Sequence, residues 1–548
     1  MSSSEYWAKP KVVREQTILF APTLDDMVSA DHEVRLLDEV LRGLDWSKWE
    51  SHYHGGRGQP PIHPRVLAGI WLYGMMRRIR TSRPLEYFCG HNIDFMWLAE
   101  GLTPDHSTLS LFFSSFRTEL KELFKQVCRI ALRMGLIRLG EVAFDGTRVR
   151  SSNSRYRTLT TQTLGERLQA LDTRIEEIMA EVQKAEADSL ATSVETGDGE
   201  SITRLPAELA DLSSRRDRLK EALEIAKALD QVRRSDGIDV TKNPAQVPMT
   251  DLESRVMPNK EGGYAPNYTP ACLTDGQNGF VLDSAVLNTV NEHPQAIPAI
   301  DRVTEMCGEA PQNFLADGGM ATGTILAGLQ SREITGFIPV KSNEPEAASP
   351  VNREDLTVPV PEHLWPLLPR NPKGQLDKSC FVYVAERDEY ICPNGRVLSN
   401  LYRERRKDVQ VRRYKCASCE GCPLVALCLS PLKTASSKRR SANKRTRSIS
   451  RDEHEALREQ MASHMEQDGS KEFFNRRSAI AETPFGYLKG IFGLRHFRHR
   501  SLEKVDHEWR WACLSLNMKK LLRALLHWRQ LVTDALAEES PATLIAVA

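Results

Sequence analysis

Two short apolar runs in this chain each end in an aspartate that is followed by glycine. The first run covers residues 142–144 and leads into Asp145, and the second covers residues 314–316 and leads into Asp317. An apolar run bounded by glycine predicts a buried strand of a parallel or mixed sheet. Ligands of such sheets bind at the carboxyl ends of the strands, so we expect the two carboxylates to lie close together and, because they repel each other, to share a cation. For either site alone, an ordinary Asp-Gly turn is the competing interpretation.

A third acid, Glu482, lies in a segment that is rich in cations, aromatic residues and glycine. Pro484 predicts that Glu482 occupies the first turn of a helix, or a kink. Lys489 follows seven positions later, a spacing of two helical turns, so it should share a face with the glutamate. The residues after it alternate cations with aromatic side chains and include Arg495 and Arg498, which are candidate DNA contacts. A plain surface helix would rarely combine these features.

Together these motifs resemble the DDE transposases of bacterial insertion sequences, and most of all the insertion-sequence eleven-eighty-two group. The resemblance extends over about residues 20–522 and is specific only when its motifs are taken jointly. It rests on Gly-Gln-Pro-Pro-Ile-His-Pro at 58–64, Pro-Asp-His-Ser-Thr at 104–108, Phe-Asp-Gly-Thr at 144–147, Ala-Asp-Gly-Gly at 316–319, and the run at 482–517 with Glu-Lys-Val at 503–505, Glu-Trp at 508–509 and Leu-Asn at 516–517. Met320 is a departure, because an aromatic residue is more usual there.

The resemblance implies that Asp145, Asp317 and Glu482 form the catalytic triad of a ribonuclease-H-like core, with Arg477 and Lys489 holding phosphates. The triad would bind two Mg²⁺ or Mn²⁺ ions about 3.5–4 Å apart. One ion would activate water to nick DNA at the transposon end, and later the 3′-hydroxyl for strand transfer, while the other would stabilise the leaving oxygen. The expected partners are double-stranded DNA, as terminal inverted repeats and target, and a second copy of the chain in a homodimer on DNA.

Two other functions remain open at this point. The chain could be a catalytically inactive descendant of a transposase that binds DNA ends without cutting them. It could also be a nuclease with the ribonuclease-H fold and no strand-transfer activity. Asp275 and Asp283 are rival acids, but both flank a hairpin turn, where aspartate is common for reasons of turn geometry.

Composition agrees with a large intracellular protein that contacts DNA locally. A chain of 548 residues with 41% hydrophobic content predicts several domains with sizeable cores. The net charge is only +1, but residues 411–449 contain ten Lys or Arg and a single acid, Glu420. No apolar run reaches membrane-spanning length, and the first residues do not resemble a signal peptide. We therefore expect no membrane association and a cytoplasmic, nucleoid-associated location in a bacterium.

Shifts in composition predict a multidomain α/β protein. Its segments are a helical N-terminal DNA-binding domain (1–139), the first strand of the catalytic core (140–160), a coiled-coil helical hairpin insertion (161–232), the continued core (233–345), a cysteine-rich basic insertion (346–470), the C-terminal helices of the core (471–530) and a tail (531–548). The mixed-sheet core is thus interrupted twice.

The helical segments carry two specific expectations. A heptad pattern that begins at Leu164 and returns from Leu205 predicts an antiparallel hairpin within one chain, with pairing between two chains as the alternative. In the N-terminal domain, Arg77, Arg78 and Arg80 are candidate readers of the transposon ends, although the domain could also serve only to pack on the core. Residues 105–107, Asp-His-Ser, predict a helix start, because three adjacent residues cannot form a catalytic triad.

The second insertion contains five clustered cysteines, Cys392, Cys416, Cys419, Cys422 and Cys428. Clustered intracellular cysteines are more often metal ligands than disulfides, so one structural Zn²⁺ is possible. The favoured ligands are Cys392, Cys416 and Cys419 with either Cys422 or Cys428, and the alternative is a knuckle of free thiols. The basic residues after the cluster should contact phosphates, unless they form a solvated loop; they are Lys438, Arg439, Arg440, Lys444 and Arg445.

Overall fold

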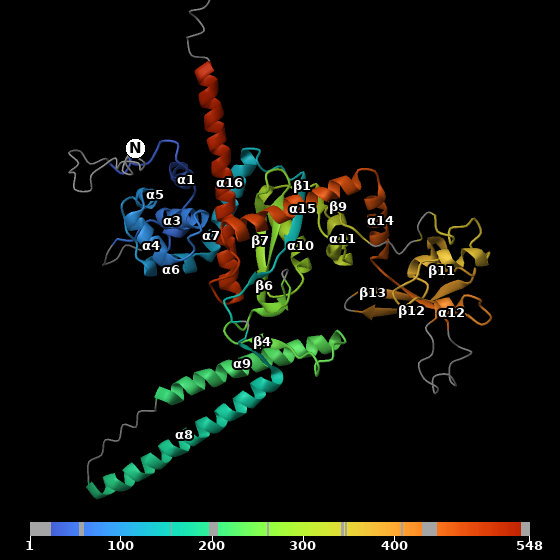
Figure 1. The fold of residues 1–548 in the computed structure, drawn as a ribbon, viewed down its shortest axis with the longest axis horizontal. Coiled ribbons are helices and arrows are strands. Elements are labelled where there is room, and N and C mark those ends of the chain that lie inside the picture. The colour runs from blue at the N-terminus through green and yellow to red at the C-terminus, as the bar shows by residue number, and fades with distance from the viewer. Residues whose placement is uncertain are drawn as a thin grey trace, which may run out of the picture. The chain divides into compact units, whose positions relative to one another are not determined.

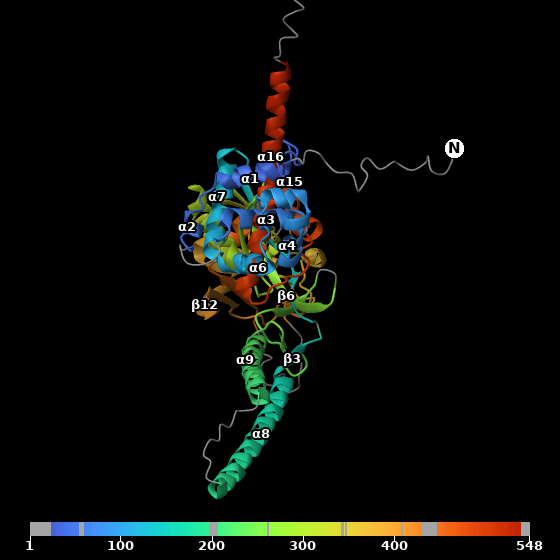
Figure 2. The same ribbon diagram turned by 90° about the vertical axis from the view of Figure 1, so that its left-hand side faces the viewer.

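The computed structural model describes residues 23–53, 60–154, 156–196, 207–259, 262–340, 345, 348–406, 409–429 and 446–538. The chain divides into two compact units, shown as ribbons in Figures 1 and 2. The first unit contains Met1–Met134, Val149–Ser254 and Gly486–Ala548, and the second contains Gly135–Arg148 and Arg255–Phe485. Both units are therefore built from segments that are far apart in the sequence. No helix in the described ranges is both long and apolar enough to cross a membrane.

The first unit has a helical core assembled from the two ends of the chain. Its helices are α1 (Glu33–Arg42), α2 (Ser47–Glu50), α3 (Pro64–Met76), α4 (Ser82–His91), α5 (Ile93–Leu98), α6 (His106–Ser115), α7 (Arg117–Arg133) and α16 (Leu502–Glu538), with a π-helical segment at Tyr487–Ile491 and the short strand β2 (Val149–Arg150). Almost every residue of α3 is buried, as expected of a helix that is apolar all round. It packs against α16, where Trp511 stacks on Phe113 with ring centroids 5.7 Å apart.

Asp105 begins helix α6 as predicted. Its carboxylate accepts a hydrogen bond from the backbone N–H of Thr108 at 2.8 Å, which satisfies a donor that the helix itself leaves unpaired. The Asp-His-Ser sequence at 105–107 is therefore a helix cap.

The first unit also carries a long helical hairpin. Helices α8 (Thr161–Thr196) and α9 (Ala207–Ser235) pack on each other, with Ile175, Ile178 and Leu212 buried between them (Figure 1). At the base, β3 (Thr158–Thr160) pairs antiparallel with β4 (Gln246–Pro248). Buried Asp230 accepts hydrogen bonds from Thr161 and from the backbone N–H of Ala245. Within the described residues, apolar side chains of α8 and α9 therefore pack on each other in one chain.

The second unit contains a mixed sheet flanked by helices. Its strands are β1 (Glu141–Gly146), β5 (Arg255–Pro258), β6 (Tyr264–Asp275), β7 (Val281–Leu287), β8 (Asn313–Leu315) and β9 (Thr335–Phe337), and its helices are α10 (Ala296–Cys307), α11 (Gly323–Gln330), α14 (Glu455–Glu466) and α15 (Ser470–Gly486). Strand β6 lies antiparallel between β7 and β1, and β1, β8 and β9 follow one another in parallel. The predicted hairpin, the two aspartate-bearing strands and the helices between them are all present.

Helix α15 differs from the sequence prediction in where it begins. It starts at Ser470, so Glu482 lies near its C-terminal end and not in its first turn. Pro484 lies inside this helix, which passes directly into the π-helical segment at Tyr487–Ile491. Because a π-helical segment winds more widely than an α-helix, the seven-residue spacing no longer predicts that Lys489 shares a face with Glu482.

A second sheet follows in the same unit and is wholly antiparallel. Its strands, in order, are β10 (Val382–Val384), β11 (Glu389–Ile391), β12 (Val397–Arg406), β13 (Val409–Cys416) and β14 (Ser448–Asp452), with the short helix α12 (Val425–Cys428) beside them. Tyr390 and Tyr414 meet edge to face in its core, with ring centroids 5.0 Å apart. The short 3₁₀ turns of this unit are His293–Gln295, Gly318–Met320, Glu362–Leu367, Lys378–Cys380 and Ala385–Arg387.

A buried ion pair joins the two ends of the chain inside the first unit. The Arg80 guanidinium donates to Glu508 Oε1 at 2.8 Å, and both side chains are at most 5% exposed. Arg80 also donates to the backbone carbonyls of Gly493 and His496. Burial alone would raise the pKa of Glu508, but the hydrogen bond from His499 and the charge of Arg80 outweigh it and lower that pKa to about 2.

Replacing Arg80 by alanine should destabilise the first unit by about 3–5 kcal/mol, because Glu508 would remain buried without its cation. The depressed pKa means that this stabilisation is complete above pH 4.5, the usual value for glutamate, and is lost as the pH falls toward 2. Urea unfolding followed by tryptophan fluorescence would measure both effects. Arg83→Ala, an exposed position on α4, is the control. An Arg80→Ala chain as stable as this control would show that the pair does not hold the unit together.

Candidate active site

Asp145 and Asp317 each follow a paired position of β1 and β8. The two strands run parallel and their ladder ends with Ala143 opposite Leu315, so each aspartate lies two residues beyond this last pair. Neighbouring strands lie about 4.8 Å apart, and positions two residues apart share a face. Ala143 and Leu315 pack on Ile480 of α15. Both carboxylates therefore belong to the α15 side of the sheet, at its carboxyl edge.

Helix α15 presents two adjacent cations to strand β1. Arg477 Nη1 lies 3.6 Å from Asp145 Oδ2, and Arg476 forms an ion pair with Glu141, four residues earlier on the same face. The other oxygen of Asp145 accepts a hydrogen bond from the N–H of Gly146 at 2.7 Å. Burial raises the pKa of Glu141, and the charge of Arg476 opposes that rise. The acidic face of β1 is thus partly neutralised by one helix.

One carboxylate oxygen of Asp317 is buried and has no hydrogen-bond partner among the described residues. Asp317 stands between β8 and the 3₁₀ turn Gly318–Met320, and this oxygen is its Oδ1. Buried polar atoms are nearly always paired, and a buried carboxylate oxygen is costly when it is not. An oxygen donor of this kind, beside a second carboxylate, fits a hard divalent cation.

The third predicted acid is not assembled with these two. The Glu482 side chain is exposed on α15. Nowhere in the described ranges are three or more His, Cys, Asp or Glu side chains grouped so that they could hold a metal ion. The assembly of Asp145, Asp317 and Glu482 into one catalytic triad therefore stays a prediction.

Two residues at the same edge were not singled out in the sequence. Strand β7 runs parallel to β1 across the sheet, so Glu292 and His293, which follow it, reach the same edge. The Glu292 carboxyl carbon lies 2.9 Å from where a Cβ of Gly146 would stand, and His293 Nε2 lies 3.5 Å from the corresponding point at Gly319. The two glycines thus leave room for both side chains. The feature of the sequence that could have identified them is a polar Glu-His pair shortly after strand β7 of the hairpin.

The rival acids have structural partners. Asp275 accepts hydrogen bonds from the backbone N–H groups of Gln277 and Asn278, as expected of a turn aspartate. Asp283 forms a two-point ion pair with Arg302, at 3.0 and 2.7 Å.

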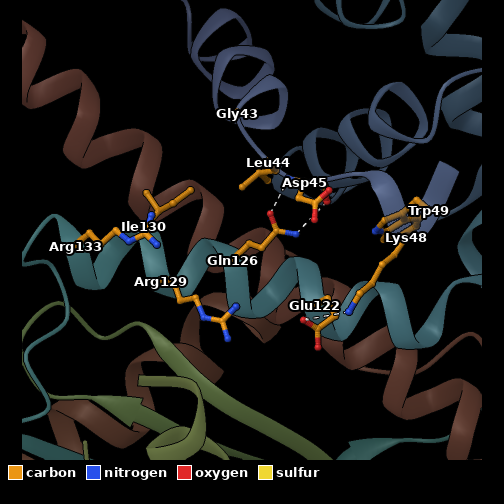
Figure 3. A pocket seen from close by; sticks show the side chains of 10 residues that line it. All are labelled: Gly43, Leu44, Asp45, Lys48, Trp49, Glu122, Gln126, Arg129, Ile130 and Arg133. Carbon is orange, nitrogen blue, oxygen red and sulfur yellow. Dashed lines mark hydrogen bonds and ion pairs between the residues drawn. The ribbon is translucent and has the colours of Figure 1, made fainter. Parts of the chain in front are cut away.

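A pocket of about 270 Å³ in the first unit gathers cations between α2 and α7 (Figure 3). Lys48 lies 3.9 Å from Glu122, whereas Arg129 and Arg133, one helical turn apart and exposed, have no ion-pair partner within the described parts of the chain. The full lining is Gly43, Leu44, Asp45, Lys48, Trp49, Glu122, Gln126, Arg129, Ile130 and Arg133. The two arginines give this pocket a positive charge that the fold does not neutralise.

The predicted DNA-contacting arginines are placed differently from one another. Arg77 pairs with Glu33 at 2.7 Å, Arg78 donates to the carbonyl of Gly490, and Arg80 is buried. Arg495 and Arg498 are exposed. The basic run comprising Lys438, Arg439, Arg440, Lys444 and Arg445 lies outside the described residues.

The five clustered cysteines line one small pocket beside the second sheet. Burial raises the pKa of Cys416 to about 11 and that of Cys428 to about 12, and none of the five forms a disulfide. Buried thiols of this kind are poor nucleophiles at neutral pH.

Two family models match the chain. A model described as a transposase domain (DUF772) matches residues 22–115, and one described as a transposase DDE domain matches residues 391–522. The second match includes Glu482 and the five cysteines, and neither match includes Asp145 or Asp317. No curated protein and no solved structure gave a match. In these two segments the chain is similar to transposases, and residues 116–390 match neither model.

If Asp145 and Asp317 share a cation, Mg²⁺ or Mn²⁺ should stabilise the chain by binding to both carboxylates. At ten times its dissociation constant, the ion should add about 1.4 kcal/mol to the free energy of unfolding. Asp145→Asn and Asp317→Asn should lose most of this gain, and Asp283→Asn should keep it despite a lower starting stability. Melting temperatures measured across a metal titration would check this. Equal shifts in all four chains would rule out a shared cation at this edge.

Proposed function

We propose that this protein is a metal-dependent DDE transposase that cuts DNA at the ends of a mobile element and joins those ends to target DNA. The observation that carries the proposal is that Asp145 and Asp317 each lie two residues beyond the last pair of two parallel strands, with Asp317 Oδ1 buried and without a hydrogen-bond partner among the described residues. The two family-model matches are consistent with it.

We also propose that the mixed sheet is a ribonuclease-H-like core. The support is its order: an antiparallel series β7, β6, β1, then β8 and β9 parallel to β1, then a helix over the face that bears the two aspartates. This is the order that the resemblance implies. The insertion-sequence eleven-eighty-two group, a homodimer on DNA, and a site of action at the bacterial nucleoid complete the proposal and rest on the sequence motifs alone.

In the proposed mechanism, Asp145 and Asp317 hold divalent cations through hard carboxylate oxygens. Such ions, when bound, lower the pKa of the attacking water or 3′-hydroxyl and stabilise the leaving oxygen. Arg477, which is 3.6 Å from Asp145, would exchange this contact for a DNA phosphate when the cation takes over the carboxylate. A further carboxylate would complete the ligand set, and the candidates are Glu482 on α15 and Glu292, which follows β7 and lies close to Gly146.

Asp145→Asn and Asp317→Asn should each lower Mg²⁺-dependent nicking of transposon-end DNA by more than about 100-fold, because even residues behind a metal ligand can cost 10–100-fold. DNA binding should persist, since phosphate contacts lie elsewhere. Asp283→Asn is the control acid and should retain nicking per folded molecule. Nicking that survives in either variant would overturn the assignment of that aspartate.

The third carboxylate is decided by a matched pair of variants, Glu482→Gln and Glu292→Gln. We expect Glu482→Gln to abolish nicking, as the resemblance implies. Full activity in Glu482→Gln together with loss in Glu292→Gln would transfer the role to Glu292. A strand-transfer assay with precut ends on the wild-type chain would separate a transposase from a nuclease of the same fold.

We further propose that the pocket between α2 and α7 binds the DNA backbone. Arg129 and Arg133 are exposed and lack acidic partners in the described ranges, which suits phosphate binding. We do not propose that Arg80 contacts DNA, because its guanidinium is buried and bonded to Glu508.

The double variant Arg129→Ala/Arg133→Ala should weaken binding to all DNA sequences alike. Each lost phosphate contact should reduce the log–log salt dependence of binding by about 0.9. Lys121→Ala, an exposed position on the same helix that does not line the pocket, is the control. Fluorescence anisotropy over a range of salt concentrations measures the slope, and an unchanged slope in the double variant would remove the pocket from the interface.

A further inference from the structure

The cysteine pocket has the dimensions of a single ion. Its volume is about 20 Å³, close to the smallest cavity that accepts one water-sized sphere. An organic ligand does not fit there. Its lining includes Cys392, Cys416, Cys419, Cys422 and Cys428, which come from the turn between β11 and β12, the end of β13, the loop after it, and α12.

Two of these sulfur atoms accept backbone hydrogen bonds. The N–H of Arg396 donates to Cys392 Sγ at 3.3 Å, and the N–H of Arg447 donates to Cys419 Sγ at 3.5 Å. Both bonds hold a sulfur atom in place at the pocket that it lines.

Each of these two cysteines begins a tight turn. The N–H of Gly395 donates to the carbonyl of Cys392 at 2.9 Å, and the N–H of Cys422 donates to that of Cys419 at 3.3 Å. Gly395 and Gly421 have φ of +71° and +65°, which glycine adopts without strain. At Gly395, a Cβ would stand 1.9 Å from the carbonyl oxygen of Thr357, so only glycine fits. The second turn brings Cys419 and Cys422 to the same pocket from two positions of one loop.

Cys416 is bonded in the opposite sense. Its thiol donates to the carbonyl of Ser418 at 3.2 Å, as the thiol of core residue Cys380 donates to Pro369 at 3.2 Å. The Cys416 sulfur atom is thus already engaged by a backbone carbonyl. This distinguishes Cys416 from the other cysteines of the pocket.

We propose that Cys392, Cys419, Cys422 and Cys428 bind one structural Zn²⁺, and that Cys416 remains a core thiol. Four thiolates at about 2.3 Å from the metal form the usual closed, tetrahedral structural site. The described side chains do not already stand at ligand positions, so binding must draw the four sulfur atoms together around the pocket they line. Each ligating thiol releases its proton on binding. The proposal does not depend on transposase activity, and its failure would leave the catalytic proposal untouched.

Metal analysis of the full chain, purified under reducing conditions without chelator, should find one zinc per chain. Cys419→Ser and Cys428→Ser should lose that zinc, while Cys416→Ser and Cys380→Ser, the matched controls, should keep it. Cobalt added in place of zinc should give the absorption of tetrahedral thiolate coordination in the wild type and in both controls. A wild-type chain without zinc that also fails to bind added zinc would overturn the proposal. Loss of zinc in Cys416→Ser with retention in Cys428→Ser would overturn the ligand set.

A measurement on the wild-type chain covers the case in which a variant does not fold. Alkylation of Cys392, Cys419, Cys422 and Cys428, followed by mass spectrometry, should be several-fold faster after chelation and should slow again when Zn²⁺ is returned. Cys89 and Cys513, buried in the first unit, should label at the same rate throughout. Labelling of the four cysteines that ignores chelator and zinc would show that they are ordinary core thiols.

Discussion

The parallel pairing of β1 with β8 is the constraint on which the candidate active site depends. Side chains alternate across a strand, so a slip of one residue would turn one aspartate to the opposite face of the sheet. The observed register pairs Ala143 with Leu315, two residues before Asp145 and Asp317, although the whole helical hairpin separates the two strands in the sequence. Ala143 and Leu315 are buried in the cluster that includes Ile480 of α15, and the neighbouring Val142 and Phe314 are buried as well, so both strands are packed on both faces. Packing of apolar side chains therefore places the carboxylates.

Helix α15 links this packing to the charge of the site. Ile480 and Ala481 bury its apolar face on the sheet, and one turn earlier Arg476 and Arg477 meet Glu141 and Asp145. Two neighbouring carboxylates would otherwise repel each other across a partly buried edge. The helix offsets the charge of β1, but Asp317 Oδ1 receives no hydrogen bond from the described residues. The uncompensated negative charge is thus concentrated on the Asp317 side of the edge.

Local patterns in the sequence predicted the elements that carry the two aspartates, but not every contact between distant elements. Apolar runs and Asp-Gly boundaries were enough to predict β1, β8 and the β6–β7 hairpin. Glu482 was misplaced within its helix because Pro484, usually a sign of a first turn, lies inside α15. Glu292 was missed because its approach to Gly146 depends on the order of strands in the sheet. The second sheet was not predicted at all, since its two longest strands, β12 and β13, are rich in arginine and carry no apolar run.

The sequence also does not show which basic side chains are paired inside the fold. The structure shows this, and it reduces the number of arginines that could contact DNA. Arg77, Arg78 and Arg80 form a conspicuous basic cluster in the sequence, yet Arg80 is paired with Glu508, more than 400 residues later, and Arg77 with Glu33. A cation that is buried against an acid contributes nothing to the field outside the protein. The net charge of +1 therefore does not show where on the protein surface the basic side chains are exposed. Arg129 and Arg133 do not belong to a basic cluster of the sequence. Both line an open pocket, where their charges are accessible to a polyanion.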